Sequence, residues 1–448
     1  MFLNMVKEFL PVSLMRALRS PYHFFWACAA ALVYGFPGRR VSVIGVTGTN
    51  GKTTVVHALH DMFRATGAGV ASVSSLRFKI NDREKPNLLK MTMPGRFHLQ
   101  RFLAQARRAG CRTVILEVTS EGITQHRHRF IGFHGGVLTN ITPEHIESHG
   151  SFAAYRAAKA RLFRALPQDG FAVLNDEDPS AIGFAAQIRA SVVRYGRSRI
   201  TLPDVAFPVS VREVTPRSIR FTVGDIAFGV PLGGDFNVMN MLAAVAAGLA
   251  SNIPADRIAA SLARFKPPAG RLEYIIEDPF AVVVDYAHTP DALESVYKTL
   301  SSGNPKSEIR NPKLICVLGS AGGGRDKWKR PEIGRIAAAY CKEVILTSED
   351  PDDEDPARIV SEIQSGMTSP AQVSERNLGG QDDQLPMIKI VLDRRGAIRE
   401  ALQDAKPGDT VIITGMGAQP WFIDRGGKKI PWDEAAIARE ELSRVNLF

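Results

Sequence analysis

The sequence predicts an α/β fold in two domains, each built on a mostly parallel sheet with helices on its faces. Two observations predict it. Short apolar runs of strand length alternate with amphipathic stretches of helical length along most of the chain. A Pro-Pro-Ala-Gly segment at 267–270 interrupts this alternation, which then resumes. The 448 residues suffice for two or three domains with full cores.

The first domain is expected to begin with a buried strand in the apolar run 41–44. A helix follows from Lys52, because apolar residues recur from Val55 to Phe63 at helical spacing, and Gly67 marks its end. Further along the chain we expect buried strands at 113–118 and 135–138, antiparallel strands over 200–230 and a helix at 237–250.

The second domain alternates more regularly, which is typical of a Rossmann-like, doubly wound sheet. Its strands are expected at 281–285, 313–318, 343–347, 388–392 and 410–414, and the polar segments 301–312 and 366–386 are expected to be surface loops. We therefore divide the chain into an N-terminal apolar and basic helical segment (1–36), a central domain (37–268) and a C-terminal domain (269–448).

A glycine-rich turn lies between the first strand and the first helix. Residues 45–54 read Gly-Val-Thr-Gly-Thr-Asn-Gly-Lys-Thr-Thr. In such a turn, backbone N–H groups and the positive end of the helix dipole face a phosphate. Lys52 would reach the terminal phosphates and the Thr53 hydroxyl would hold Mg²⁺. Although Val46 departs from the usual spacing and a structural glycine turn is the alternative, the pattern favours ATP and a P-loop ATPase domain.

Composition and charge are those of an ordinary soluble globular protein, with 45% hydrophobic and 23% charged residues. The net charge of +10 comes from scattered Lys and Arg without interleaved aromatic residues, so we expect no nucleic-acid partner. Four cysteines lie far apart and form no CxxC pair, so we expect no disulfide framework or zinc ribbon and a reducing cytoplasm; they are Cys28, Cys111, Cys316 and Cys341.

The N-terminal segment combines basic residues with an apolar stretch. Lys7, Arg16 and Arg19 precede the apolar residues 22–35. These are fewer than the roughly 20 that span a bilayer, and no small-residue cleavage site follows, so a secretory signal is not expected. Two interpretations are open: a helix packed on the first domain, or a helix lying in the membrane interface.

Three further residues suit phosphate and metal chemistry. Glu117 ends a predicted strand, where a Mg²⁺ ligand would lie beside the phosphate loop. His145 belongs to a cluster of His and Glu at 144–149, and a single His among oxygen ligands fits Mg²⁺ better than zinc. Lys159 lies on an amphipathic helix, where the plain interpretation is a lysine whose head reaches water.

Seven motifs in one order resemble a known family. They are GTNGKTT (48–54), EVTSEGI (117–123), NITPEHIESHG (140–150), YRAAKARLF (155–163), GDFNVMNMLAA (234–244), DYAHTPDAL (285–293) and GRDKWKRP (324–331). Together they resemble the Mur ligases, the ATP-dependent peptide-forming enzymes of peptidoglycan synthesis. The resemblance covers about residues 34–445 and is closest to the branch that adds the third residue of the stem peptide.

The resemblance implies roles for matching positions. ATP would be bound by Gly48, Thr49, Asn50, Gly51, Lys52, Thr53, Thr54, Asn237, Asp285 and His288. Catalysis would involve Lys52, Glu117, His145 and Lys159, and two Mg²⁺ ions would be held by Thr53, Glu117, His145 and a carbamylated Lys159. The substrates would contact Thr92, Ser120, Gln125, Arg127, Arg325, Asp350, Asp352 and Gln419.

The implied reaction has two steps. A muramyl-peptide carboxylate takes the γ-phosphoryl group of ATP, giving an acyl phosphate and ADP, and the amine of an amino acid then displaces phosphate. Charge builds on oxygens in both steps, so Mg²⁺ and Lys52 would stabilise it. We expect a cytoplasmic monomer, with a peripheral contact of residues 1–36 at the inner face of the membrane as a further hypothesis.

The sequence departs from the family pattern on the substrate side. About 40 residues precede the first strand, too few for a uridine-nucleotide domain, and this suggests a lipid-linked acceptor. The family's Asp-Asn-Pro-Arg is here residues 349–352, so Asp352 inverts a charge and favours a cationic or neutral amino acid over diaminopimelate. A solvated acidic turn is the alternative. Gln419 stands where the family commonly has Glu.

Two alternative functions stay open at this point. A folylpolyglutamate- or cyanophycin-type ligase would share the phosphate loop and the lysine. A catalytically silent ATP-binding scaffold of a cell-wall complex would need neither acceptor nor amino acid.

Overall fold

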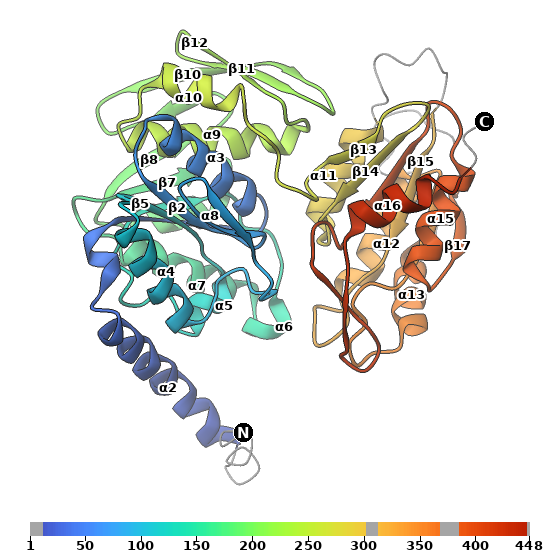
Figure 1. The fold of residues 1–448 in the computed structure, drawn as a ribbon, viewed down its shortest axis with the longest axis horizontal. Coiled ribbons are helices and arrows are strands. Elements are labelled where there is room, and N and C mark those ends of the chain that lie inside the picture. Colours follow the sequence, from blue (N-terminus) through green and yellow to red (C-terminus); the bar gives the residue numbers. More distant parts are fainter. Residues whose placement is uncertain (1–11, 302–311, 368–384, 446–448) are drawn as a thin grey trace.

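Two α/β domains lie side by side in the computed structural model, which describes residues 12–301, 312–367 and 385–445 (Figure 1). One sheet uses residues before the predicted linker at 267–270 and the other uses residues after it. The expected α/β class is confirmed. The domain boundaries that we set stay a prediction, and the loops expected at 301–312 and 366–386 lie mostly outside the described residues.

The central domain has a 12-stranded sheet with the order β12-β11-β10-β9-β8-β7-β6-β1-β5-β2-β3-β4. The strands from β8 to β2 in this order are parallel, and the flanks on both sides are antiparallel. The bounds are β1 Ser42–Thr47, β2 Val70–Val73, β3 Arg77–Ile80, β4 Arg83–Pro86, β5 Thr113–Glu117, β6 Phe133–Leu138, β7 Phe171–Asn175, β8 Ser191–Tyr195, β9 Arg199–Thr201, β10 Ala206–Val214, β11 Ile219–Val223 and β12 Ile226–Val230.

Helices cover both faces of this sheet, and an apolar core lies under each face. On one face lie α3 Lys52–Ala65, α9 Asp235–Ala250 and α10 Ala255–Leu262. On the other lie α4 Arg96–Arg108, α5 Ser120–Thr124, α7 Phe152–Arg164 and α8 Pro179–Ala185; the short α6, Ile146–His149, is in a loop. Because β1 is in the middle of the sheet, the loop after it opens at the centre of the sheet's carboxyl edge.

The C-terminal domain has a 6-stranded sheet with the order β13-β14-β18-β15-β16-β17, parallel except for β13. Its bounds are β13 Glu273–Ile276, β14 Ala281–Asp285, β15 Leu314–Leu318, β16 Glu343–Leu346, β17 Met387–Ile390 and β18 Thr410–Thr414. One face is covered by α11 Pro290–Ser301, α12 Lys329–Tyr340 and α13 Pro356–Gln364, and the other by α15 Arg394–Asp404 and α16 Glu434–Leu442. The doubly wound prediction is confirmed.

Small elements complete the chain. A hairpin of β19 Trp421–Ile423 and β20 Lys429–Pro431 follows β18, and the 3₁₀ turns are η1 Pro37–Arg40 and η2 Ser365–Met367. The N-terminal helix α2, Val12–Val33, projects from the central domain (Figure 1). None of the helices in the described part of the chain is both long and apolar enough to cross a membrane.

Two cysteines differ from the expectation drawn from their spacing. Cys316 on β15 and Cys341 at the end of α12 form a disulfide, although they are 25 residues apart. The spacing could not reveal this pair, because the two cysteines meet only when α12 packs against β15, the strand that precedes it. Cys28 and Cys111 are free thiols.

Candidate active site

A phosphate cradle follows β1 as predicted. Gly51 has φ +81°, and a Cβ there would lie 1.9 Å from the Asn240 Oδ1 of α9. Gly48 is as tightly enclosed, since a Cβ there would lie 1.9 Å from the Thr139 Oγ1. The loop backbone is also pinned from outside, because Thr49 N donates to the Asn140 carbonyl at 2.8 Å. Glycine is therefore required at both positions.

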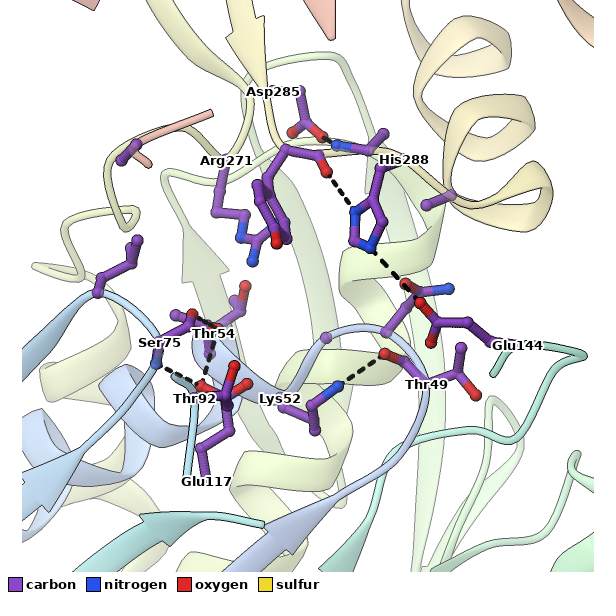
Figure 2. Close-up of a pocket in the computed structure, with 18 of the residues that line it drawn as sticks. Thr49, Lys52, Thr54, Ser75, Thr92, Glu117, Glu144, Arg271, Asp285 and His288 are labelled. Atoms are coloured by element: carbon purple, nitrogen blue, oxygen red, sulfur yellow. Dashed lines mark hydrogen bonds and ion pairs between the residues drawn. The ribbon is translucent and has the colours of Figure 1, made fainter. Parts of the chain in front are cut away.

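The cradle carries one cation and a pair of hard oxygen ligands. Lys52 Nζ donates only to loop carbonyls, those of Gly48 at 3.1 Å and Thr49 at 2.7 Å. Thr53 Oγ1 lies 3.0 Å from Glu117 Oε2, which also accepts from the Ser75 N–H at 2.9 Å. Figure 2 shows Lys52 and Glu117 at the floor of the cavity. These groups fit a nucleotide phosphate and a Mg²⁺ ion.

Protein side chains alone would supply few ligands to a metal ion in this site. Among the residues that the structure describes, no group of three His, Cys, Asp or Glu side chains could hold a metal ion. Mg²⁺ is commonly bound through one or two carboxylates, with waters and substrate phosphates completing the shell. The Thr53 and Glu117 pair suits that mode.

Lys159 is buried rather than solvated. Its side chain is 1% exposed, its Nζ donates to the Gly48 carbonyl at 2.7 Å and it lies 4.5 Å from the centre of the Tyr155 ring. Burial and then the charge of Lys52 lower the pKa of Lys159 well below its ordinary value. The plain interpretation of a lysine with its head in water is therefore wrong.

Glu144 lies between two histidines, one from each domain, and so links the two domains across the cavity. Glu144 Oε1 lies 3.4 Å from His288 Nε2 of the C-terminal domain (Figure 2). The other oxygen, Oε2, lies 3.7 Å from His145 Nε2. Burial alone would raise the pKa of Glu144, but the hydrogen bond from His288 and the charge of His145 hold it well below the ordinary value. Burial lowers the pKa of His145, which favours the neutral imidazole that a metal ligand needs.

The C-terminal domain supplies the second wall. Asp285 is buried and accepts from the backbone N–H groups of Leu272 and Ala287, both at 2.7 Å, so it shapes the turn that presents His288. Asn50 in the cradle donates to Asp291 of α11 at 3.1 Å. The nucleotide loop is thus held from both domains.

The enclosed cavity between the domains has a volume of about 240 Å³. Fourteen of the predicted site residues line it: Thr49, Asn50, Gly51, Lys52, Thr53, Thr54, Thr92, Glu117, His145, Asn237, Asp285, His288, Arg325 and Gln419. Gly48 of the cradle and Lys159 behind it do not line the cavity, and the Lys159 Nζ donates to the Gly48 carbonyl.

Three predicted acceptor residues lie outside this cavity, around α5. Gln125 Oε1 accepts from Arg127 Nη2 at 2.6 Å, and Arg127 Nη1 donates to the Met93 carbonyl. Ser120 Oγ is 3.1 Å from His149 Nε2. Neighbouring residues therefore already hold these three polar side chains in place, and their role as acceptor contacts stays a prediction.

The residues predicted to contact the incoming amino acid lie in different places. Asp350 lines an adjoining pocket and forms an ion pair with Lys90 of the central domain. Arg325 and Gln419 line both cavities. Asp352 lies outside both, where its carbonyl accepts from the Gly426 N–H at 2.6 Å.

Two residues of this pocket were missed by sequence reasoning. Glu349 is 6% exposed and its Oε2 has no hydrogen-bond partner within the described structure. It belongs to the acidic run that we noted, but nothing in that run distinguishes a buried carboxylate from a solvated one. Lys90 follows no local pattern, because its partners Asp350 and the Trp421 carbonyl come from the other domain.

Comparison with known proteins agrees with this geometry. A model described as the Mur ligase middle domain matches residues 46–248, and one described as the Mur ligase, glutamate ligase domain matches residues 270–417. A UDP-N-acetylmuramoyl-L-alanyl-D-glutamate–2,6-diaminopimelate ligase of Gloeobacter violaceus is 38% identical over 425 residues, which is 93% of this chain and 80% of that protein. A UDP-N-acetylmuramyl-tripeptide synthetase of a Roseiflexus species is 37% identical over 438 residues, 93% of this chain and 81% of that protein.

Solved structures give the same fold. A UDP-N-acetylmuramoyl-L-alanyl-D-glutamate–2,6-diaminopimelate ligase has a TM-score of 0.57 at 28% identity, covering 90% of this chain and 78% of that chain. A Mycobacterium tuberculosis folylpolyglutamate synthase, complexed with ADP and AMPPCP, has a TM-score of 0.67 at 19% identity, covering 93% and 95%. At that identity the likeness shows a common fold alone.

The phosphate cradle, the oxygen ligands and the cavity between two domains, together with the named relatives, indicate an ATP- and Mg²⁺-dependent ligase that joins an acid to an amino acid. The chain belongs to the Mur ligase family. The resemblance stated from its motifs is confirmed.

Proposed function

We propose that this enzyme activates the carboxylate of a muramyl-peptide acceptor as an acyl phosphate and joins it to an amino acid. The observation that carries the proposal is that the phosphate cradle and the Thr53 and Glu117 pair line one cavity between the domains, while the buried Lys159 contacts the cradle from behind. Curated relatives that cover 93% of the chain carry the names of ligases of this kind. The folylpolyglutamate alternative rests on fold alone, and the scaffold alternative leaves these groups without a use.

The side chains divide the work between ATP and the acceptor. Lys52 would leave its loop carbonyls to neutralise the terminal phosphates, and the cradle N–H groups would orient them. Bound Mg²⁺ would supply charge neutralisation of the transferred phosphoryl group. The close approach of both domains would keep water away from the acyl phosphate, which hydrolyses readily.

Carbamylation of Lys159 is part of the proposal. Carbon dioxide reacts with a neutral amine, and the lowered pKa of Lys159 favours that form. The amine nitrogen would bond to the carbon of CO₂ and lose one proton to solvent, and the carbamate anion would still carry an N–H for the Gly48 carbonyl, so an oxygen ligand would replace a buried amine. A second Mg²⁺ ion, shared with His145, would then have a sufficient ligand set.

The amino acid is proposed to carry a cationic side chain. Asp350 already has Lys90 as its partner, whereas Glu349 is buried and its Oε2 has none. Burial raises the pKa of Glu349, so an ammonium brought into the pocket would give this carboxyl a reason to ionise. The support for a cationic substrate therefore lies in Glu349 rather than in Asp352.

Release of phosphate from ATP, measured with a panel of amino acids and muramyl-dipeptide acceptors, tests the function. UDP-linked and lipid-linked acceptors form the two arms of the acceptor test. Turnover is expected only when acceptor and amino acid are both present, and Lys52→Ala should abolish it. Phosphate release with no acceptor or amino acid dependence would contradict the proposal.

Selectivity for the side chain is tested by comparing lysine with norleucine, its neutral analogue. Glu349→Gln should reduce kcat/KM for lysine by about 10-fold or more and change norleucine little. Asp353→Asn, an exposed carboxylate in the same loop, is the matched control. Equal losses for both amino acids would show that Glu349 does not read the charge. A monomeric state and a cytoplasmic location stay predictions, as does contact of residues 1–36 with a membrane.

A further inference from the structure

The outer face of α2 carries a stripe of apolar side chains that are exposed in the described part of the chain. Its exposed members recur at helical spacing along the described side chains: Leu18, Tyr22, Phe25, Trp26, Leu32 and Val33. Phe25 is 62% exposed and Val33 is 68% exposed. Phe97 of α4, 37% exposed, extends the stripe sideways, with its ring centre 6.1 Å from that of Trp26.

The opposite face of α2 holds the helix on the central domain. Ala27, Ala30 and Ala31 are buried against it. Ser20 Oγ lies 2.8 Å from His126 Nε2, and the Phe24 ring packs on Phe130 at 5.4 Å. These contacts hold the helix with its apolar stripe outward.

The charged residues on the two helices that form the stripe, α2 and α4, are all basic. Neither α2 nor α4 contains an Asp or Glu, whereas Arg19 and Arg101 are exposed on them. Arg39 and Arg40 of η1, which packs on α4, add two more exposed cations. An apolar stripe with Tyr and Trp, on helices whose charged residues are all basic, matches the interface of an anionic bilayer. A second copy of the same face would bring these arginines together.

We propose that α2 docks the enzyme on the surface of an anionic lipid bilayer, with the stripe in the interface and the arginines at the headgroups. The helix lies in the plane and does not span. This docking is independent of the ligase chemistry. If the proposed function also holds, it brings the Gln125 and Arg127 segment toward the bilayer, because α2 bonds to His126 between them and Arg96 donates to the Gln125 carbonyl at 2.6 Å.

Flotation of the full chain with vesicles tests the docking. Binding is expected to vesicles containing phosphatidylglycerol, more weakly to pure phosphatidylcholine, and it should weaken as salt is raised. The double variant Phe25→Glu/Leu32→Glu should bind about 10-fold or more weakly. Ile182→Glu is the matched control, since Ile182 is 69% exposed on α8 and lies outside the stripe.

Two outcomes would overturn the proposal. One is equal vesicle binding by the double variant and the wild type. The other is self-association of the wild type in sedimentation that the double variant loses, without vesicle binding, because the stripe would then be covered by a second copy. Phosphate release by the double variant in solution, with a soluble acceptor, should stay within about 2-fold of wild type. This readout distinguishes failure of docking from failure of the ligase function.

Discussion

At the residue scale, Lys159 combines features that a structural lysine would not need. A buried ammonium is costly unless it is paired, and in the described part of the chain the Lys159 Nζ contacts the Gly48 carbonyl and the Tyr155 ring rather than a carboxylate. The cost of burying Lys159 behind the phosphate cradle is explained if its amine is converted there to a carbamate anion. Chemistry, not packing, is then the reason for the burial.

Replacing Lys159 tests this reading. Lys159→Arg keeps a cation but cannot carry a carbamate, so kcat should fall by about 100-fold or more with nucleotide binding retained. Labelled bicarbonate should give a carbamate signal by carbon NMR in the wild type and not in the variant. Lys266→Arg, at an exposed lysine, should leave both unchanged. A fully active Lys159→Arg enzyme would exclude the carbamate.

A second residue-scale prediction concerns stability at low pH. His60 is fully buried on α3, and burial, then the charge of Lys79, lower its pKa to about 3. The unfolded state binds a proton near pH 6.5 while the folded state does not, so the contribution of His60 is full above pH 6.5 and is lost as pH falls toward 3. Between pH 8 and pH 5 this loss amounts to about 2 kcal/mol.

Urea unfolding at pH 8 and pH 5 measures that loss. His60→Gln removes the titrating group, so the difference in unfolding free energy between the two pH values should shrink by about 2 kcal/mol. His98→Gln changes an exposed histidine and should leave the difference as in the wild type. An unchanged difference in His60→Gln would mean that His60 is protonated in the folded state.

At the scale of elements, much of the fold follows from local pattern. The strands at Ala281–Asp285 and Thr410–Thr414 have the predicted bounds, because buried parallel strands are short unbroken apolar runs. The four-residue hairpin strands β3 and β4 escaped prediction, since their side chains are half or fully exposed and show no apolar alternation. One antiparallel flank of the central sheet was predicted, because the strands expected over 200–230 are present as β10, β11 and β12, whereas the flank formed by β3 and β4 was not.

In the candidate site too, residues in local motifs could be predicted and contacts between distant segments could not. Local motifs located the cradle and Glu117, since the glycine-rich turn directly follows the strand β1 and Glu117 is the last residue of the apolar strand β5. Pairs between distant segments could not be found, such as Lys90 with Asp350 or Gly51 against Asn240. These depend on how two domains and two helices meet.

The cradle itself can be tested with a pair of glycines that share a backbone conformation. Gly51 and Gly67 have φ +81° and +83°, but a Cβ at Gly67 meets nothing within 4 Å. Gly51→Ala and Gly67→Ala should both lose about 1 kcal/mol of stability from the left-handed backbone. Only Gly51→Ala should also lose nucleotide binding, by about 10-fold or more, because its Cβ displaces Asn240 and the loop. Calorimetric titration with ADP measures this, and equal affinity in both variants would contradict it.

At the scale of the whole molecule, contacts between the domains determine whether the cavity is closed. Lys90 reaches across to Asp350 and to the Trp421 carbonyl, while Trp421 Nε1 donates to the Leu88 carbonyl at 3.2 Å. Asn50 and Asp291 close the nucleotide side. The site is complete only when both contacts form.

Removing the Lys90 contact should therefore favour an open form. Lys90→Met should increase the radius of gyration in solution scattering and lower kcat by about 10-fold, because the acyl phosphate is less protected from water. The exposed Lys85 offers the control variant Lys85→Met. An unchanged radius together with full activity would show that the contact does not govern closure.

The central position of β1 also has a consequence for synthesis of the chain. Its two neighbours are β5 and β6, and the cradle after it is held by Asn140 and Asn240. A growing chain at roughly 5–20 residues per second needs about ten seconds or more between making β1 and making Asn240. Until then the cradle cannot close on a nucleotide, so ATP cannot stabilise the nascent central domain and that half of the protein must complete its sheet unaided.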